Sequence, residues 1–445
     1  MIVDPVEVRE VDGGVERSAR LHWTGGEVRL AVSGPADVID RGDDASGMVC
    51  ASLPLALRRG ASLHVHGPVA PELLARIEEL QALYLAWDPK TSPIELDARP
   101  PAGEAGATAP PASGSAAFFS RGVDSLFAAA RDRAGPQQLT ALLFVDRLEP
   151  RHDDAVRAEE IRRAEAAADQ LGLPLVVVST TIHGAFDEAQ FDWEDAVGAA
   201  LAFVAHGVAG GFGRMLIASG DSYSTVEPCG TSPLLDPLFS TDRMTIVHDT
   251  LAYTRLGKIG WLAKERPDLL AHLKVCFKEN RPDNCGHCGK CLLTMAGLHV
   301  HGALEQATQF PDEIDPEGIR AFHLPTLRAR VDWAEVAAAL GSTGFDGELR
   351  AAALDTLRTS ALTGPDRRDA AGNPAWSDPY WIRNHRLNAT LSLAVDGRPY
   401  PPLPDDAPPS ARPGVEPEPL ADASGSPRIP RFRWSRRRSG SPRPR

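Results

Sequence analysis

Short segments that are apolar throughout alternate with amphipathic segments along the middle of the chain. The predicted strands cover residues 116–120, 139–145, 173–180 and 214–219, and the predicted helices cover 123–134, 154–172 and 193–208. Strands that are apolar on both sides and alternate with helices are typical of a parallel sheet covered on both faces. We therefore expect an α/β, Rossmann-like domain over residues 116–300, with any ligand at the carboxyl ends of its strands.

The regions on either side of this domain have other patterns. Residues 1–98 predict a small α+β domain with a hairpin turn near Gly25. A Pro/Ala/Gly-rich linker without periodicity follows at 99–115. Residues 301–395 are expected to be mostly helical. Residues 396–445 are rich in Pro and then Arg, a composition that cannot bury a core, so we expect a disordered tail there.

Charge and composition narrow the function classes. The 445 residues carry a formal net charge of −13, which argues against a nucleic-acid coat or a membrane-surface role for the folded part. The last eighteen residues differ, with eight Arg and no acid, and could contact nucleic-acid phosphates nonspecifically. Residues 196–213 are uncharged, but their Ala- and Gly-rich composition predicts a buried helix and not a membrane span. Because the N-terminus is not a signal peptide, we expect a cytoplasmic protein without membrane contact.

Four of the six cysteines fall within sixteen positions, at Cys276, Cys285, Cys288 and Cys291. In a reducing compartment such closely spaced cysteines are more often metal ligands than disulfides. The spacing Cys-x2-Cys-x2-Cys, with a fourth cysteine upstream, predicts one closed tetrahedral Zn²⁺ site. An iron–sulfur cluster uses the same four thiolates, and free core cysteines are a further alternative. His287 lies inside the run, but four sulfurs already complete the coordination shell.

The turn between the strand at 116–120 and the following helix offers donors for an anion. Small residues allow backbone N–H groups to approach a phosphate, and the start of a helix favours negative charge. Asp124 could hold Mg²⁺ attached to that phosphate, or it could simply cap the helix in an ordinary strand–turn–helix. The predicted anion-binding residues are Ser120, Arg121, Gly122, Val123, Asp124 and Ser125.

This hexapeptide resembles the Ser-Gly-Gly-x-Asp-Ser loop of the PP-loop (N-type) ATP pyrophosphatases. Within that superfamily, the run Cys-Gly-His-Cys-Gly-Lys-Cys at 285–291 is similar to the zinc motif of 7-cyano-7-deazaguanine synthases. The resemblance covers residues 115–300, roughly. It implies that residues 120–125 bind ATP with Mg²⁺ and that the four cysteines hold structural Zn²⁺. It also implies transfer of AMP to a substrate oxygen with release of pyrophosphate.

Further candidates follow the later strands. Lys258 lies in a helix whose place resembles that of a helix with a Thr-Lys pair near the family's active site. There it would neutralise phosphate charge as a catalytic residue together with Asp124, whereas a solvated surface lysine is the alternative. Asp221 and Ser222 follow the strand at 214–219 and are the predicted substrate-binding residues.

The chain departs from the family pattern at several positions. Arg121 replaces the first Gly of the loop, where it would either crowd a position that needs a positive φ or add a cation for the phosphates. Asp146-Arg147-Leu148 stands where the family has Tyr-Gly-Gln, and Thr294 replaces an Arg after the last zinc ligand. These changes concern the substrate side more than the ATP side. The resemblance therefore predicts the adenylating chemistry and not deazaguanine as the substrate.

Three functions are compatible with these residues. The first is an adenylating enzyme that activates a carboxylate or amide oxygen of a small molecule for attack by a nitrogen nucleophile. The second is a PP-loop sulfurtransferase in which Cys229 carries sulfur, although a plain packing cysteine is the simpler interpretation of Cys229. The third is a non-catalytic, zinc-clamped scaffold or nucleic-acid-binding module whose loop Arg121 has disabled.

Overall fold

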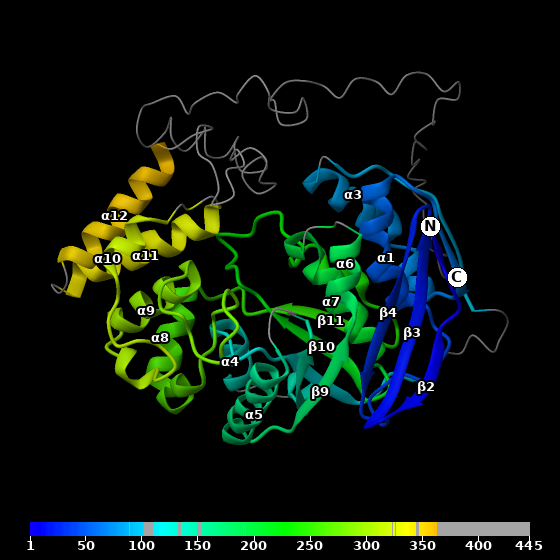
Figure 1. The fold of residues 1–445 in the computed structure, drawn as a ribbon, viewed down its shortest axis with the longest axis horizontal. Coiled ribbons are helices and arrows are strands. Elements are labelled where there is room, and N and C mark those ends of the chain that lie inside the picture. Colours follow the sequence, from blue (N-terminus) through cyan, green and yellow to red (C-terminus); the bar gives the residue numbers. More distant parts are fainter. Residues whose placement is uncertain are drawn as a thin grey trace, which may run out of the picture.

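The computed structural model describes residues 1–362, without 89, 102–109, 132–134, 149–152, 190, 192, 323, 325 and 344–346. Its strands form one sheet, and helices pack on both faces of that sheet (Figure 1). The tail predicted at 396–445, including its Arg-rich end, lies outside the described residues, as does the second part of the helical region predicted at 301–395.

Five parallel strands form one half of the sheet, in the order β11-β10-β7-β8-β9. They are short and rich in apolar residues because helices cover both faces. This arrangement confirms the predicted α/β class with a mostly parallel central sheet. The strands are β7 (Gly114–Phe118), β8 (Ala141–Asp146), β9 (Leu175–Thr180), β10 (Phe212–Ala218) and β11 (Thr245–Asp249).

The strand order creates a topological switch point between β7 and β10. From β7 the chain proceeds outward through β8 and β9, and then returns to the other side of β7 to form β10 and β11. The loops that follow β7 and β10 therefore leave the sheet in opposite directions, and in sheets of this kind the ligand crevice lies between two such loops. The connecting helices are α4 (Val123–Ala130), α5 (Asp154–Leu171), α6 (Ile182–Glu188) and α7 (Trp193–Gly207).

The uncharged segment at 196–213 is a buried helix, as predicted. It forms most of α7 and the start of β10, and α7 packs against α1 in the core of one face. Among the helices of the described residues, none is long and apolar enough to cross a membrane.

The N-terminal region continues the same sheet. β4 pairs antiparallel with β9 at Val32–Thr180 and Ser33–Ser179, so the strands of residues 1–99 extend the parallel half. The unit predicted over 1–98 therefore shares both a sheet and a hydrophobic core with the central region. Its elements are β1 (Ile2–Val3), β2 (Glu7–Val11), β3 (Gly14–Trp23), β4 (Gly26–Gly34), α1 (Ser46–Arg59), β5 (Leu63–Pro68), α2 (Pro71–Leu74), α3 (Ile77–Trp87) and β6 (Leu96–Arg99).

Helices follow β11 up to residue 362. The first of them pack with α4 and α5 on one face of the sheet, and α11 and α12 form a smaller core against α9. These helices are α8 (Arg255–Glu265), α9 (Gly289–Val300), α10 (Pro316–Arg320), α11 (Leu327–Thr343) and α12 (Gly347–Leu362). Single 3-10 turns occur at Gly135–Gln137, Asp236–Phe239, Pro267–His272 and Leu304–Gln306.

Candidate functional site

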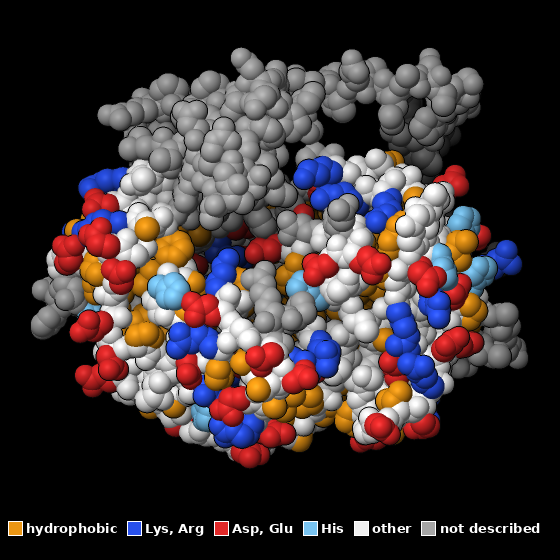
Figure 2. All heavy atoms as spheres, viewed as in Figure 1, with side chains coloured by type: hydrophobic (Ala, Val, Ile, Leu, Met, Phe, Trp, Pro, Cys, Tyr) orange, Lys and Arg blue, Asp and Glu red, His pale blue; other side chains and the backbone are white. Residues whose placement is uncertain are grey.

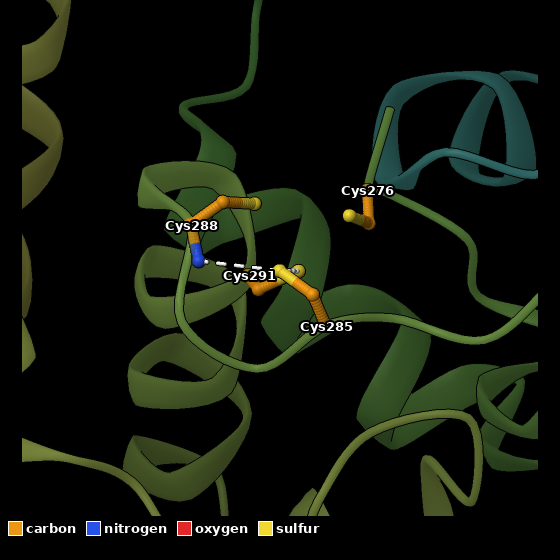
Figure 3. A group of neighbouring side chains, drawn as sticks. All are labelled: Cys276, Cys285, Cys288 and Cys291. Carbon is orange, nitrogen blue, oxygen red and sulfur yellow. Dashed lines mark hydrogen bonds between the residues drawn. The ribbon is translucent and has the colours of Figure 1, made fainter. Parts of the chain in front are cut away.

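The four clustered cysteines converge on one point (Figure 3). All four are buried, and their Sγ atoms lie within 4.8 Å of one another. The Sγ atoms of Cys285 and Cys291 are 3.7 Å apart, which matches the edge of roughly 3.8 Å of a tetrahedron of sulfurs around zinc. The cluster could therefore hold a structural metal such as zinc.

The turn from Cys285 to Cys288 is shaped for such a cluster. Gly286 has a φ of +80°, and a Cβ atom there would come within 2.5 Å of Pro311, so the position needs glycine. The backbone N–H of Cys288 donates to the Sγ of Cys285 over 3.3 Å. Cys288 then begins α9, and Cys291 faces inward from its first turn. The tight turn thus supplies two of the four sulfurs, and the first turn of α9 supplies a third.

Asn284 brings Cys276 to this turn. Its side-chain oxygen accepts from the backbone N–H groups of Val275 and Cys276, and its amide donates to the carbonyl of Leu273. His287 points outward, with 65% of its side chain exposed and its Nε2 atom 2.9 Å from Glu279. The four thiols are therefore the buried donor set of this segment.

The loop predicted to bind ATP lies at the carboxyl end of β7. Gly122 precedes the first turn of α4, and no side chain caps this helix, so the simpler interpretation of Asp124 as a capping residue is wrong. The hydroxyl of Ser125 instead accepts from the N–H of Ser120 over 3.3 Å and donates to the carbonyl of Gly122 over 3.2 Å. Ser120 is exposed, and Val123 is buried under the loop. These bonds close the loop on itself, and no side chain caps the start of α4.

Arg121 has the positive φ that its place in the loop suggested, at +59°. Its side chain is fully buried, where its guanidinium forms an ion pair with Glu160 of α5 and donates to the carbonyl of His272 over 3.4 Å. Burial lowers the pKa of Arg121, and Glu160 opposes this shift. The guanidinium therefore lies beneath the loop and supplies no cation to its outer face, which corrects the expectation that Arg121 could contact phosphates.

Lys258 is buried and joins the two sides of the crevice. Its Nζ donates to Asp124 Oδ1 over 2.9 Å, beside β7, and to the carbonyl of Ser219 over 2.6 Å, at the end of β10. With a side chain that is 0% exposed, it is not the solvated surface lysine of the alternative interpretation. Arg255, one turn earlier on α8, donates to Asp124 Oδ2 over 3.0 Å.

These contacts set the charge of Asp124. Burial raises the pKa of this carboxyl, but Lys258 and Arg255 outweigh burial and hold the pKa below its usual value. A fifth of the Asp124 side chain remains exposed. Asp124 is thus an ionised carboxylate at the edge of the crevice.

The residues predicted to bind substrate lie across from Asp124, after β10. Asp221 is buried, and its Oδ1 atom is 3.2 Å from the guanidinium of Arg328. Burial raises the pKa of Asp221, although Arg328 works against that shift. Ser222 is turned into its own loop, where its hydroxyl bonds to those of Ser224 and Thr225. Asp221 therefore belongs to the same charged cluster as Asp124, and Ser222 supports the loop.

The sequence did not single out Arg328 and Asp332, which α11 brings to the crevice. Arg328 has acidic groups around it. Burial lowers the pKa of Arg328, but Asp221, Cys229 and Glu227 raise it by more, so the net shift is upward. Asp332 is also buried, and burial raises its pKa to about 6 despite the nearby charges of Arg255 and Arg328. No motif marks these residues, because only the packing of α11 on α8 and α9 brings them near β10.

Cys229 is buried beside this cluster, close enough to Arg328 to affect the pKa of the guanidinium. Gly230, which follows it, has no room for a Cβ atom against the start of α7, and its N–H donates to the carbonyl of Glu194 over 3.0 Å. Cys229 therefore lies in a loop that is fixed on both sides.

Comparisons with protein-family models, with curated proteins and with solved structures found no match. The likeness to PP-loop ATP pyrophosphatases therefore depends on the two short sequence motifs alone. On the part of the surface visible in Figure 2, acidic and basic side chains are interspersed.

Proposed function

We propose that the protein is an ATP-dependent adenylating enzyme that transfers AMP to a carboxylate or amide oxygen of a small molecule and releases pyrophosphate. The observation that carries this proposal is the position of Lys258. It links the phosphate-binding loop after β7 to the loop after β10 at the switch point, where parallel α/β sheets bind ligands.

The groups around Lys258 suit a triphosphate. The uncapped first turn of α4 offers backbone N–H groups, and the exposed hydroxyl of Ser120 adds a donor. Lys258 and Arg255 are cations that would stabilise negative charge as pyrophosphate leaves. Asp124, once these two cations turn toward the phosphates, would supply a carboxylate oxygen to Mg²⁺.

The chemistry is an in-line transfer at the α-phosphorus. A substrate oxygen forms a bond to this phosphorus while the bond to the pyrophosphate oxygen breaks, and a nitrogen nucleophile then displaces AMP. Asp221, after β10, and its ion-pair partner Arg328 would contact the substrate in this proposal. The cysteine cluster, with Zn²⁺, holds the segment before α9 and takes no part in the chemistry.

The two alternatives have less support. A sulfurtransferase that uses Cys229 needs a second reactive cysteine, but the others are the four of the cluster and Cys50, which is buried in the N-terminal core. A scaffold with a disabled loop was suggested by Arg121, whose side chain lies beneath the loop and leaves its outer face open.

The test is calorimetric titration of the metal-loaded protein with ATP, with and without Mg²⁺. We expect micromolar binding with Mg²⁺ and weaker binding, by about tenfold, without it, because a hydrogen-bonded charge contact is worth at least that much. In Asp124→Asn this effect of Mg²⁺ should disappear. Asp249→Asn is the matched control, since Asp249 ends β11 and pairs with Arg131 outside the loop. If the folded, metal-loaded wild type does not bind ATP, the proposal is refuted.

A further inference from the structure

The cysteine segment and the phosphate-binding loop are in direct contact. The backbone N–H of Lys274, two residues before the first cysteine of the cluster, donates to the carbonyl of Arg121 over 3.0 Å. The Nζ of Lys274 donates to the carbonyls of Arg281 and Asp283, over 2.8 and 3.0 Å. Both carbonyls belong to the stretch between Cys276 and Cys285. One lysine thus touches the loop and holds the chain that connects two metal ligands.

Glu160 joins these parts from α5. It pairs with the guanidinium of Arg121, and its Oε1 atom is 3.7 Å from the Nζ of Lys274. The three side chains are all nearly or fully buried, at 0%, 8% and 5% exposed for Arg121, Glu160 and Lys274. Buried charges of this kind are stable only while their partners stay in place. Displacement of Lys274 would therefore disturb Arg121 as well.

A second contact from α5 follows the same path. Arg163, one turn after Glu160, donates to the carbonyl of Pro282 over 3.2 Å and to the carboxylate of Asp283 over 2.8 Å. The stretch between the cysteines is thus fixed to α5 at two points, and α5 is fixed to the loop through Arg121.

The backbone conformation of Arg121 depends on its contacts with neighbouring segments. A non-glycine residue at a φ of +59° costs roughly 1 kcal/mol relative to glycine, so surrounding contacts must hold it there. The contacts that hold it are the pair with Glu160 and the bond from the N–H of Lys274. The second of these contacts comes from the cysteine segment itself, and Lys274 of that segment also lies 3.7 Å from Glu160.

We propose that Arg121 is a positioning residue that couples the metal site to the phosphate-binding loop, so that metal at the four cysteines and ATP with Mg²⁺ at residues 120–125 stabilise each other. This inference rests on the proposed function. Coupling between two sites is reciprocal, so it can be measured from the metal side with no knowledge of the substrate.

The experiment measures the rate at which a chelator removes zinc from the protein, with and without saturating ATP and Mg²⁺. In the wild type we expect ATP to slow metal release by about tenfold, within the usual range of coupling between two sites. The double variant Arg121→Met with Glu160→Leu replaces the buried pair by apolar side chains and keeps the residue at 121 non-glycine. At ATP and Mg²⁺ concentrations that saturate this variant, the effect of ATP on metal release should fall below about twofold.

The matched control is Arg162→Gln, which removes a pair with Glu159 on the exposed side of α5 and leaves the pair of Glu159 with Arg163 in place. It should retain the full effect of ATP. If the wild type binds ATP and ATP leaves metal release unchanged, or if the double variant keeps the full effect, the coupling is refuted while the proposed function stands.

If the double variant does not fold, a second measurement on the wild-type protein tests the same inference. Hydrogen exchange of the backbone amides of residues 121–125 is followed in wild-type protein with and without metal, in the absence of ATP. We expect these amides to exchange faster without metal. The increase in their exchange rate should exceed that of the amides of β8, a strand that Arg121 does not link to the cysteine segment. Equal protection with and without metal overturns the inference. Failure of ATP to bind refutes the proposed function, and the exchange result then decides separately whether the metal orders the loop.

Discussion

The cysteine cluster and the charged cluster at the switch point are both buried, but they are built in different ways. The four sulfurs come from sixteen consecutive residues and lie within 4.8 Å of one another. The charged cluster is assembled from α4, α8, α11 and the loop after β10. It comprises Asp124, Asp221, Arg255, Lys258, Arg328 and Asp332.

The difference concerns what each cluster needs from outside. Each of the three bases of the charged cluster pairs with a carboxylate of the same cluster, so the cations have partners without a ligand. A ligand such as ATP must therefore replace existing pairs of Asp124 with Lys258 and Arg255. The cysteine cluster consists of one kind of group, four thiols that could hold a structural metal such as zinc. We therefore expect the first cluster to exchange ligands and the second to keep its ion.

Metal removal should separate the two clusters most strongly. We expect chelation, or Cys288→Ser, to lower the free energy of unfolding by at least about 4 kcal/mol, because metal binding contributes directly to folding. The measurements are the metal content by mass spectrometry and unfolding in denaturant with and without chelator.

Cys229→Ser is the control for this experiment, since Cys229 is buried outside the cluster. It should leave one metal ion per chain. A Cys288→Ser protein with unchanged metal content and stability would show that the cluster is a set of core cysteines.

Lys258 tests the charged cluster in the same way. Lys258→Met keeps the length of the side chain but leaves the carbonyl of Ser219 without this donor and Asp124 with Arg255 alone. We expect a loss of about 3 kcal/mol, typical of a broken buried pair, together with weaker ATP binding. Lys264→Met is the matched control on the same helix, because its side chain is 82% exposed, and it should change neither quantity measurably. A Lys258→Met protein as stable as Lys264→Met would show that the buried pair contributes nothing.

Sequence reasoning found the local cluster completely and the assembled one in part. The spacing of the cysteines was sufficient because one tight turn and the first turn of α9 place three of them. Asp124 was predicted from a short motif at a strand end, and Lys258 from the resemblance of its helix to one in the PP-loop family. Arg328 and Asp332 could not be found, because they reach the site only through the packing of a helix far along the chain.

The fold shows the same limit. Uniformly apolar segments predicted four of the five parallel strands, since that pattern is local, whereas β11 was not predicted. The pairing of β4 with β9 joins residues 146 and 148 positions apart and leaves no local signal, so the N-terminal region was expected to form a separate unit. The direction of the Arg121 side chain also depends on a distant partner, Glu160 of α5.

Asp332 offers the finest distinction between the two clusters. Its pKa in the folded protein is raised to about 6 by burial, whereas that of an unfolded aspartate is about 3.9. An acid with a raised pKa lowers stability where it is ionised in the folded state, so its cost is absent below about pH 4, grows up to about pH 6 and is constant above. We expect Asp332→Asn to stabilise the protein by about 1–3 kcal/mol at pH 8 and not at pH 4, measured by denaturant unfolding at both values.

Asp355→Asn on α12, which removes a carboxylate paired with Arg320, should show no such gain. Every substitution in the cysteine cluster should destabilise the protein. A gain in stability from Asp332→Asn would therefore mean that the charged cluster keeps an acid at the expense of stability, as expected of a ligand site. A loss at pH 8 would instead make Asp332 a structural partner of Arg255 and Arg328.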